Sequence, residues 1–127
     1  LEVWKFALDY CDLLYDLSDN LPKNEDFNLK VQIRRAATSV CLNIAEGSTS
    51  QTNAEQTRFL GMAIRSLIET VACLRLIDRR NYCPNELILK ADQSSNVLAK
   101  KLQAFRNSLK TRPKRIGEDS VAYDVSL

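Results

Sequence analysis

Short polar and charged side chains recur at helical spacing between residues 32 and 46 of this 127-residue chain. Side chains three or four residues apart share one face of a helix. The recurring set consists of Gln32, Arg35, Ser39, Asn43 and Glu46. A solvated helix face usually carries long Lys and Glu side chains in no particular order. This face therefore favours a polar seam against a neighbouring helix or a ligand.

A second stack of the same kind, Arg58, Arg65 and Glu69, follows on the next helical segment. Arginine and carboxylate side chains on two facing helices can form bidentate ion pairs, for example Arg35 with Glu69. Such pairs can fix the register of two helices, and we expect the seam to have this structural use. Arg34 lies about 100° round the helix from Arg35 and is expected to face solvent or a nucleic acid instead.

A block of cations without any acid lies between residues 100 and 115. Its members are Lys100, Lys101, Arg106, Lys110, Arg112, Lys114 and Arg115. Residues 1–99 carry 11 Lys and Arg against 13 Asp and Glu, and residues 116–127 carry three acids and no Lys or Arg. The dipole of a helix favours each cation near its C-terminus by about 0.3–1 kcal/mol. Seven cations exceed that need, so the block indicates a phosphate-binding patch, with a solvated helix end or a partner-protein surface as alternatives.

The residue types weigh against most catalytic and metal chemistry. The chain has no histidine, so Glu46 and Glu69 cannot belong to a Glu-x-x-His di-metal site. Gly47 is followed by Ser48 and Ser50, but the Gly-Lys-Ser/Thr of a phosphate loop is missing. We therefore expect no enzymatic activity, no metal and no cofactor.

The four cysteines are predicted to be reduced structural thiols. Cys11, Cys41, Cys73 and Cys83 form no Cys-x-x-Cys pair, and the first three fall inside apolar helical patterns. This use of cysteine is typical of a cytoplasmic protein. No apolar run approaches the ~20 residues that a membrane span needs. Because Leu1 is not a methionine, we expect a few residues to precede it or to have been trimmed.

Apolar residues repeat with a helical period in four segments, at about residues 2–18, 26–46, 53–80 and 85–110. Short breaks separate the segments, and the periodicity stops after Thr111. The pattern predicts an all-α, up-down-up-down antiparallel four-helix bundle over residues 1–110. A charge-segregated tail over residues 111–127 is expected to follow it.

Local signals predict where the helices begin and end. Pro22 disfavours helix in the residue before it and closes the first segment. Gly47 is predicted to end the second helix in the left-handed conformation. Asn53 with Gln56 three residues on resembles a capping box that opens the third helix, and Asn85 is predicted to cap the fourth.

The first and third segments have apolar or small residues on more than one face. In the first, Trp4, Leu8, Cys11 and Tyr15 widen the main stripe, while the third carries Ala63, Ser66, Thr70 and Cys73 beside its own. A monomeric bundle needs only one wide stripe per helix. The surplus therefore favours burial in an oligomer.

Several of these motifs together resemble a known family. They are Leu1-Glu-Val-Trp4, Leu21-Pro22, Gln32-Ile-Arg-Arg-Ala-Ala37, Asn43-Ile-Ala-Glu-Gly47, Arg58-Phe-Leu60, Ala63 and Ser66-Leu-Ile-Glu69. They resemble the four-helix-bundle proteins encoded by intervening sequences in bacterial large-subunit ribosomal RNA genes. The chain is also similar to the accessory variability determinant of diversity-generating retroelements. The resemblance covers roughly residues 1–110.

The resemblance implies a non-enzymatic homopentameric barrel of four-helix protomers. For the retroelement branch it also implies binding of a template RNA and of a reverse transcriptase, whereas the ribosomal branch has no assigned activity. Two features depart from simpler members, namely Cys41 in place of a proline or small residue and a longer tail beyond Lys110. The motifs do not separate the two branches.

We therefore predict an oligomeric scaffold that binds structured RNA or DNA through a basic rim. The rim would consist of the seven cations of residues 100–115 together with Arg34. An accessory role beside a retroelement reverse transcriptase is the favoured form of this prediction. The alternative is a protein–protein adaptor bundle without any role in nucleic-acid binding.

Overall fold

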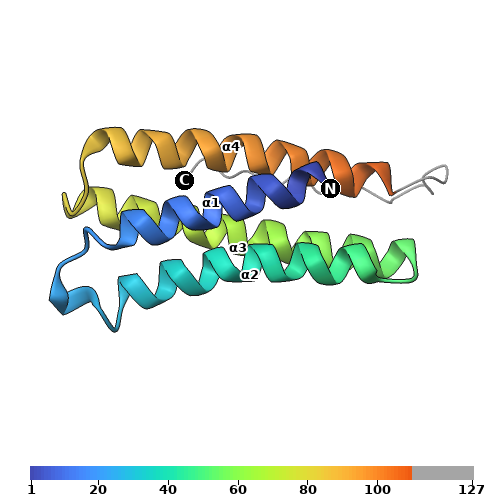
Figure 1. Ribbon diagram of the computed structural model, residues 1–127, viewed down its shortest axis with the longest axis horizontal. Coiled ribbons are helices and arrows are strands. Elements are labelled where there is room, and N and C mark those ends of the chain that lie inside the picture. The colour runs from blue at the N-terminus through green and yellow to red at the C-terminus, as the bar shows by residue number, and fades with distance from the viewer. Residues whose placement is uncertain (110–127) are drawn as a thin grey trace, which may run out of the picture.

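The structure is a computed structural model that describes residues 1–109. Its elements are α1 (Glu2–Ser18), the short 3-10 helix η1 (Lys23–Glu25), α2 (Leu29–Thr49), α3 (Asn53–Arg79) and α4 (Asn85–Ser108). The four long helices lie side by side and alternate in direction (Figure 1). Helices α1 and α3 each pack against both α2 and α4. The predicted all-α bundle of four packed helices is confirmed, and no strand occurs within the described residues.

The second helix begins at Leu29, later than the predicted start near Asp26. The chain first forms η1, in which the Glu25 N–H donates to Pro22 O at 2.9 Å and the Asp26 N–H donates to Lys23 O at 3.1 Å. These bonds between residues three apart are those of a 3-10 turn. The chain therefore reverses direction in this tight turn before α2 can start.

Gly47 does not end α2, which continues to Thr49, so the predicted left-handed termination is wrong. Instead, this glycine allows α3 to pack closely against α2. A Cβ atom at position 47 would lie 3.2 Å from Phe59 Cβ and 3.6 Å from the Gln56 carbonyl oxygen. A side chain at position 47 would require α3 to shift by a few tenths of an ångström, so glycine suits this contact between α2 and α3.

The caps differ by one residue from those predicted. Thr52, rather than Asn53, caps α3, because its Oγ1 accepts a hydrogen bond from the Glu55 N–H at 3.1 Å. Asn53 instead donates from Nδ2 to the Leu109 carbonyl oxygen at 3.3 Å, which links the start of α3 to the end of α4. Asn81, with φ of 56°, supplies the left-handed residue after α3.

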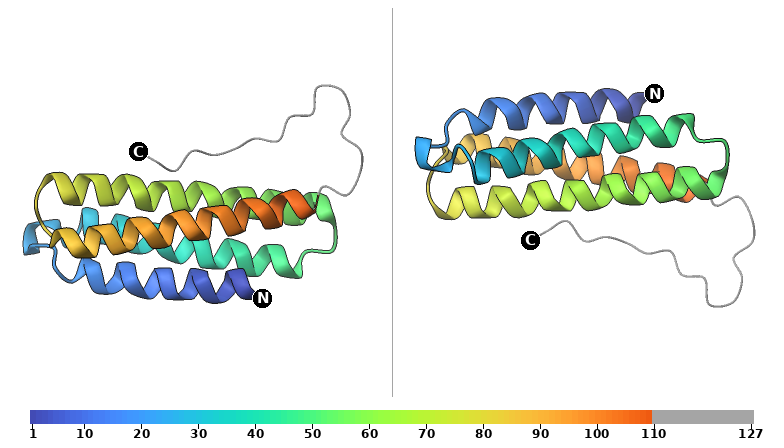
Figure 2. Two further views of the ribbon diagram at one scale, coloured as in Figure 1. Left: turned by 90° about the horizontal axis from the view of Figure 1, so that it is seen from above. Right: turned by 90° about the horizontal axis from the view of Figure 1, so that it is seen from below.

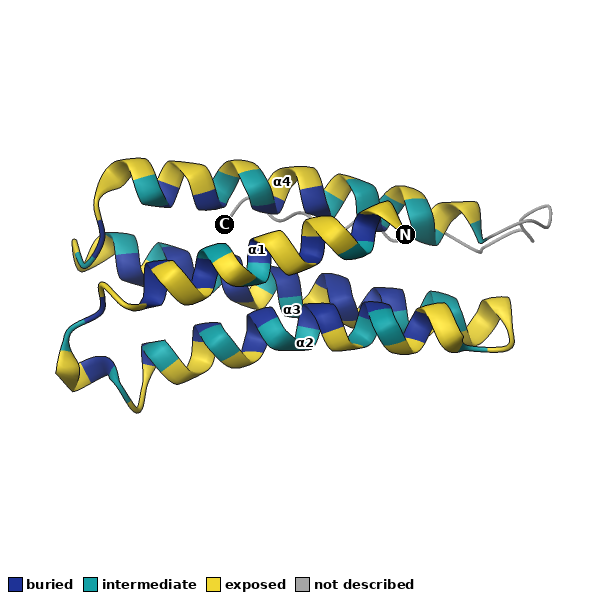
Figure 3. Ribbon diagram, in the orientation of Figure 1, coloured by how far each residue is buried: buried dark blue, intermediate teal, exposed yellow. Residues whose placement is uncertain are grey.

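The core consists of the apolar stripes of all four helices. Figure 3 shows the buried positions on the inner sides of the helices and the exposed positions on the outer sides. Fully buried side chains include Leu14, Ile33, Ile44, Leu67 and Leu98. One polar contact lies among them, where the Tyr10 hydroxyl and Thr70 Oγ1 are 2.8 Å apart. Tyr10 is the one buried tyrosine of α1, and this contact gives its hydroxyl a hydrogen-bond partner.

A carboxylate joins the two turns at one end of the bundle. Glu25 is buried in η1, where it accepts a hydrogen bond from the Tyr82 hydroxyl at 2.9 Å and another from Asn28 Nδ2 at 2.9 Å. These two hydrogen bonds, that of Tyr82 first, hold the pKa of the Glu25 carboxyl below its usual value. The ionised carboxylate therefore helps to hold the α1–α2 turn against the α3–α4 turn.

We expect Glu25→Gln to remove a pH-dependent part of the free energy of unfolding. Because the folded pKa lies below the unfolded value of about 4.3, this contribution is present above the unfolded pKa. It is lost as the pH falls through the folded pKa. Urea unfolding should therefore show a larger difference between wild type and Glu25→Gln at pH 7 than at pH 3.

The matched control is Glu86→Gln, which removes an exposed carboxylate near the same turn. This variant should resemble the wild type at both pH values. An equal loss of stability for Glu25→Gln at pH 7 and pH 3 would contradict the role assigned to the ionised carboxylate.

Candidate nucleic-acid interface

Three of the seven residues of the predicted basic block lie within the described part of the chain. Lys100, Lys101 and Arg106 occupy the C-terminal half of α4. The other four predicted contacts, Lys110, Arg112, Lys114 and Arg115, lie outside the described residues. The structure therefore places the beginning of the block at the end of the bundle where α1 and α3 start and α2 ends (Figure 1).

The two lysines of the block have different surroundings. Lys100 is exposed and forms no ion pair with any described residue. Lys101 donates to Glu2 Oε1 at 2.8 Å, and its ammonium lies 4.5 Å from the centre of the Phe6 ring. The Lys101 ammonium also lowers the pKa of the Glu2 carboxyl. Lys101 thus ties α4 to α1, while Lys100 remains accessible to a ligand.

Arg106 packs between α3 and α4 rather than lining an open rim. Its guanidinium lies over Gly61 of α3, so that a Cβ atom at position 61 would be 3.3 Å from Nη2. The side chain is only partly exposed. The phosphate contact at Arg106 stays a prediction, for a side chain that lies partly against α3.

Arg34, which is predicted to face solvent or a nucleic acid, is partly exposed and has partners on α1 and just after it. Its Nε donates to Ser18 Oγ at 2.7 Å and its Nη2 donates to Asp19 Oδ1 at 2.8 Å. Its guanidinium lies 4.9 Å from the centre of the Tyr15 ring. Arg34 therefore fastens the start of α2 to the end of α1.

The predicted polar seam lies where α2 and α3 run side by side, as the right-hand view of Figure 2 shows. At its centre Ser66 Oγ donates to Ser39 Oγ at 2.9 Å. Asn43 Nδ2 donates to the Ser39 carbonyl oxygen at 2.9 Å and lies 3.1 Å from Ser39 Oγ. The seam thus contains one interhelical hydrogen bond, made by two small side chains.

The charged members of the seam do not pair across it. The exposed set is Gln32, Arg35, Glu46, Arg58, Arg65 and Glu69. Ion pairs among residues 1–109 join Lys30 to Asp26, Arg34 to Asp19, Arg75 to Asp92 and Lys101 to Glu2. The predicted pair between Arg35 and Glu69 does not form, because both side chains extend into solvent, where hydration competes with an ion pair.

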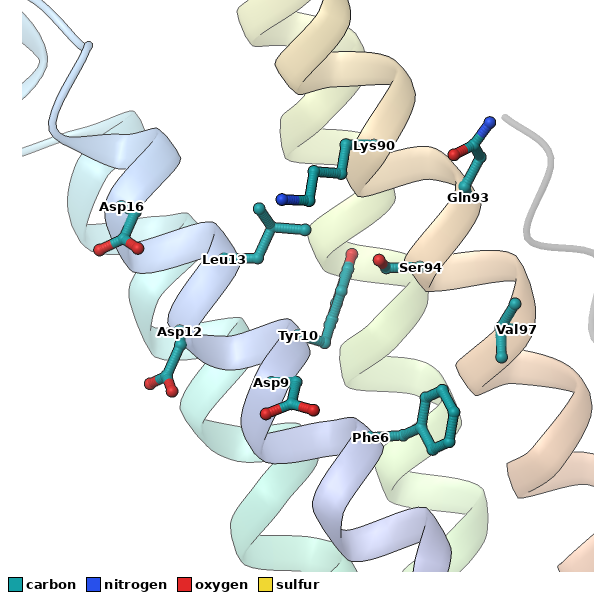
Figure 4. A pocket seen from close by; sticks show the side chains of 10 residues that line it. All are labelled: Phe6, Asp9, Tyr10, Asp12, Leu13, Asp16, Lys90, Gln93, Ser94 and Val97. Atoms are coloured by element: carbon teal, nitrogen blue, oxygen red, sulfur yellow. The ribbon is translucent and has the colours of Figure 1, made fainter.

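A groove of about 490 Å³ separates α1 from α4 on another side of the bundle. Tyr10 and Leu13 project into it from α1, and Lys90 reaches from α4 toward α1 (Figure 4). Asp9, Asp12 and Asp16 line its α1 side, so its carboxylates outnumber its one cation. The net negative charge of the groove repels phosphate, so the groove differs electrostatically from the basic end of α4.

The thiols are free, and burial makes them poor nucleophiles. Cys41, Cys73 and Cys83 are buried, and Cys11 is partly buried. Burial raises the pKa of Cys41 to about 12 and that of Cys73 to about 11, so both are protonated at neutral pH. Within residues 1–109, no group of His, Cys, Asp or Glu side chains could hold a metal ion. None of the helices in that range is long and apolar enough to cross a membrane.

Sequence reasoning missed Glu2, which binds Lys101, and Gly61, against which Arg106 lies. Glu2 and Lys101 are 99 residues apart in the sequence, so no local pattern connects them. The contact of Gly61 was not predicted because this glycine lies within a continuous helical pattern. A glycine inside such a pattern indicates a close neighbour, and here that neighbour is a guanidinium.

Comparisons with known proteins agree on the fold and on a family. A family model described as "23S rRNA-intervening sequence protein" matches residues 1–104. A crystal structure from Bacteroides thetaiotaomicron, described as a protein with unknown function from the S23 ribosomal protein family, is 26% identical. The similarity covers 82% of this chain and 97% of that chain, with a TM-score of 0.76. No curated protein matches the chain.

Alanine at the two interhelical glycines is expected to have opposite effects on stability. At Gly47 the new Cβ meets Phe59 Cβ, which cannot move without its helix, so overpacking of about 1–3 kcal/mol outweighs the gain in helix propensity. At Gly61 it meets the far end of the flexible Arg106, and the propensity gain of about 1 kcal/mol is retained. Chemical denaturation of Gly47→Ala and Gly61→Ala measures both, and equal effects would contradict this assignment.

Proposed function

Since the chain belongs to the 23S rRNA-intervening sequence protein family, we propose that it is a non-enzymatic helical scaffold that binds structured RNA. The observation that carries the proposal is the segregation of charge. Seven cations without an acid follow one another from residue 100 to residue 115, and the rest of the chain has a net negative charge. Solubility alone does not require positive and negative side chains to lie in separate parts of the chain.

Phosphate is the ligand chemistry that suits this block. Lysine and arginine side chains on one short segment neutralise several phosphates at once and release the counterions condensed on the nucleic acid. Such contacts position the ligand but do not read its sequence. The proposed binding is therefore strongly dependent on salt and weakly selective for sequence.

The surroundings of the three described cations support a choice among them as phosphate contacts. Lys101 is bound to Glu2 of α1 and Arg106 lies against Gly61 of α3, so both side chains are already engaged within the bundle. Lys100 is exposed on the same part of α4 and has no ion pair among the described residues. We assign the phosphate contacts to Lys100 together with Lys110, Arg112, Lys114 and Arg115.

Two finer proposals rest on the resemblance described above. One is assembly into a ring of five copies, which light scattering on the purified protein measures directly. The other is an accessory role beside a reverse transcriptase, for which co-purification with a reverse transcriptase encoded next to it is the test. The names of the matching family and of the solved relative refer to ribosomal RNA and to a ribosomal protein, which supports an RNA ligand for both forms.

The test is a filter-binding titration against a structured RNA over a range of salt concentrations. Neutralising the five assigned contacts, as Lys100→Gln, Lys110→Gln, Arg112→Gln, Lys114→Gln and Arg115→Gln, should weaken binding at least tenfold. If each contacts one phosphate, the slope of log affinity against log salt should become shallower by about 3.5–4.5.

The control neutralises five exposed cations elsewhere, namely Lys5, Lys23, Arg79, Arg80 and Lys90. Both variants have the same net charge, so a general electrostatic attraction affects them equally. Equal weakening in both variants would contradict a phosphate site at the end of α4. The absence of any RNA binding by the wild type at low salt would favour the protein–protein adaptor.

A further inference from the structure

Helices α1 and α2 face each other at positions that repeat every seven residues, which is about two helical turns. Near one end of the pair, Ser18 Oγ of α1 accepts a hydrogen bond from Arg34 Nε of α2 at 2.7 Å. Near the other end, Trp4 and Ser48 line one surface pocket of about 170 Å³. Because the helices run in opposite directions, a third facing pair lies midway, seven residues from each of these.

This middle pair consists of two cysteines, Cys11 and Cys41. The Cys41 thiol reaches α1, because its Sγ donates to the Ala7 carbonyl oxygen at 3.4 Å. In an α-helix a carbonyl points toward the residue four further along, which here is Cys11. Burial has the largest effect on the pKa of both thiols, and hydrogen bonding between them is a further cause of each shift. The two side chains therefore point toward each other, as a disulfide requires.

A second contact between the helices keeps the two cysteines at one level. The Tyr15 hydroxyl lies 3.0 Å from Thr38 Oγ1. Tyr15 is four residues beyond Cys11, and Thr38 is three residues before Cys41, so the helices are in register on this side as well. Groups that a fold holds together react as if each were highly concentrated around the other. The pair can therefore react with itself although burial keeps the fraction of thiolate small.

The four cysteines differ in their access to solvent. Cys11 is partly buried, whereas Cys41, Cys73 and Cys83 are buried. Cys83 lies in a separate place, where its Sγ donates to the Leu17 carbonyl oxygen at 3.6 Å. A small oxidant therefore reaches Cys11 first, and the thiol beside Cys11 is that of Cys41.

We propose that Cys11 and Cys41 are an oxidation site, at which hydrogen peroxide forms a disulfide between α1 and α2. The Cys11 thiolate attacks the peroxide, an S–O bond forms, the O–O bond breaks and hydroxide leaves, which gives a sulfenic acid. The Cys41 sulfur then attacks the Cys11 sulfur, the S–S bond forms and the S–O bond breaks. The departing hydroxide takes the Cys41 proton and becomes water. Overall, two thiols lose two electrons, and one peroxide is reduced to two molecules of water.

The disulfide closes a loop over the turn between α1 and α2. The two cysteines are 30 residues apart and enclose η1. A cross-link of this kind restricts the unfolded chain and so stabilises the fold. It also prevents α1 from separating from α2, and a dithiol reductant reverses it. None of the residues assigned to phosphate takes part, so this site is independent of the proposed RNA binding.

The test treats the purified full chain with hydrogen peroxide, alkylates the remaining thiols under denaturing conditions and measures the intact mass. All four cysteines should be alkylated in the reduced chain, and only Cys73 and Cys83 after oxidation. Digestion should release one cross-linked pair of peptides, which contains Cys11 and Cys41. Dithiothreitol should restore alkylation at all four positions, and the oxidised chain should unfold at a higher urea concentration than the reduced chain.

Three variants separate this pair from general thiol oxidation. Cys11→Ser changes a partly exposed position, so it should fold, and peroxide should leave its urea unfolding curve unchanged. Cys41→Ala removes the second thiol, so the sulfenic acid at Cys11 should persist and react with dimedone. The matched control is Cys83→Ala, which removes a buried thiol outside the pair and should form the disulfide at the rate of the wild type.

Three results of the mass measurement on the wild type would overturn the proposal. In the first, Cys11 is oxidised to a sulfinic acid while Cys41 remains alkylated. In the second, the disulfide joins a different pair of cysteines or two copies of the chain. In the third, all four thiols survive a peroxide concentration that oxidises free cysteine. Each of these results is read on the wild type, so the decision does not depend on the folding of a variant.

Discussion

The close approach of α2 and α3 constrains the rest of the structure. Gly47 lets Phe59 approach at a distance that a side chain at position 47 would have to widen, and Ser39 meets Ser66 directly. Helices that touch through such small residues leave no space between them for long side chains. Arg35, Glu46, Arg58 and Glu69 are therefore displaced to the outer surface of the pair. The packing that secures the core thus also creates the charged α2–α3 face.

The same reasoning separates structural cations from available ones. Arg75 donates to both carboxylate oxygens of Asp92 at 2.6 Å, and Arg34 bridges Ser18 and Asp19, so each joins two elements of the bundle. Isolated surface pairs contribute only about 0–1 kcal/mol, and their main effect here is to fix side chains in position. Lys100 has no such partner among the described residues. A cation that the bundle does not use remains available for an external anion.

The fold could be predicted from the sequence because the helical period of apolar residues is strong, as with Leu60, Ile64, Leu67 and Leu74 of α3. Errors arose where one residue type serves two purposes. Glycine ends many helices, but Gly47 instead admits a neighbouring helix, and no single-helix pattern distinguishes the two uses. Thr52 and Asn53 are both good capping residues, and the choice depended on Asn53 finding the Leu109 carbonyl group.

The candidate site was less predictable than the fold. The cations of residues 100–115 were visible in the sequence, but their partners were not. Glu2 and Gly61 approach α4 only after the helices have assembled, so sequence reasoning treated Lys100, Lys101 and Arg106 as equivalent. Likewise, Ser39 of the predicted seam meets α3 through Ser66, but the charged members of the seam are exposed and do not form the expected ion pairs.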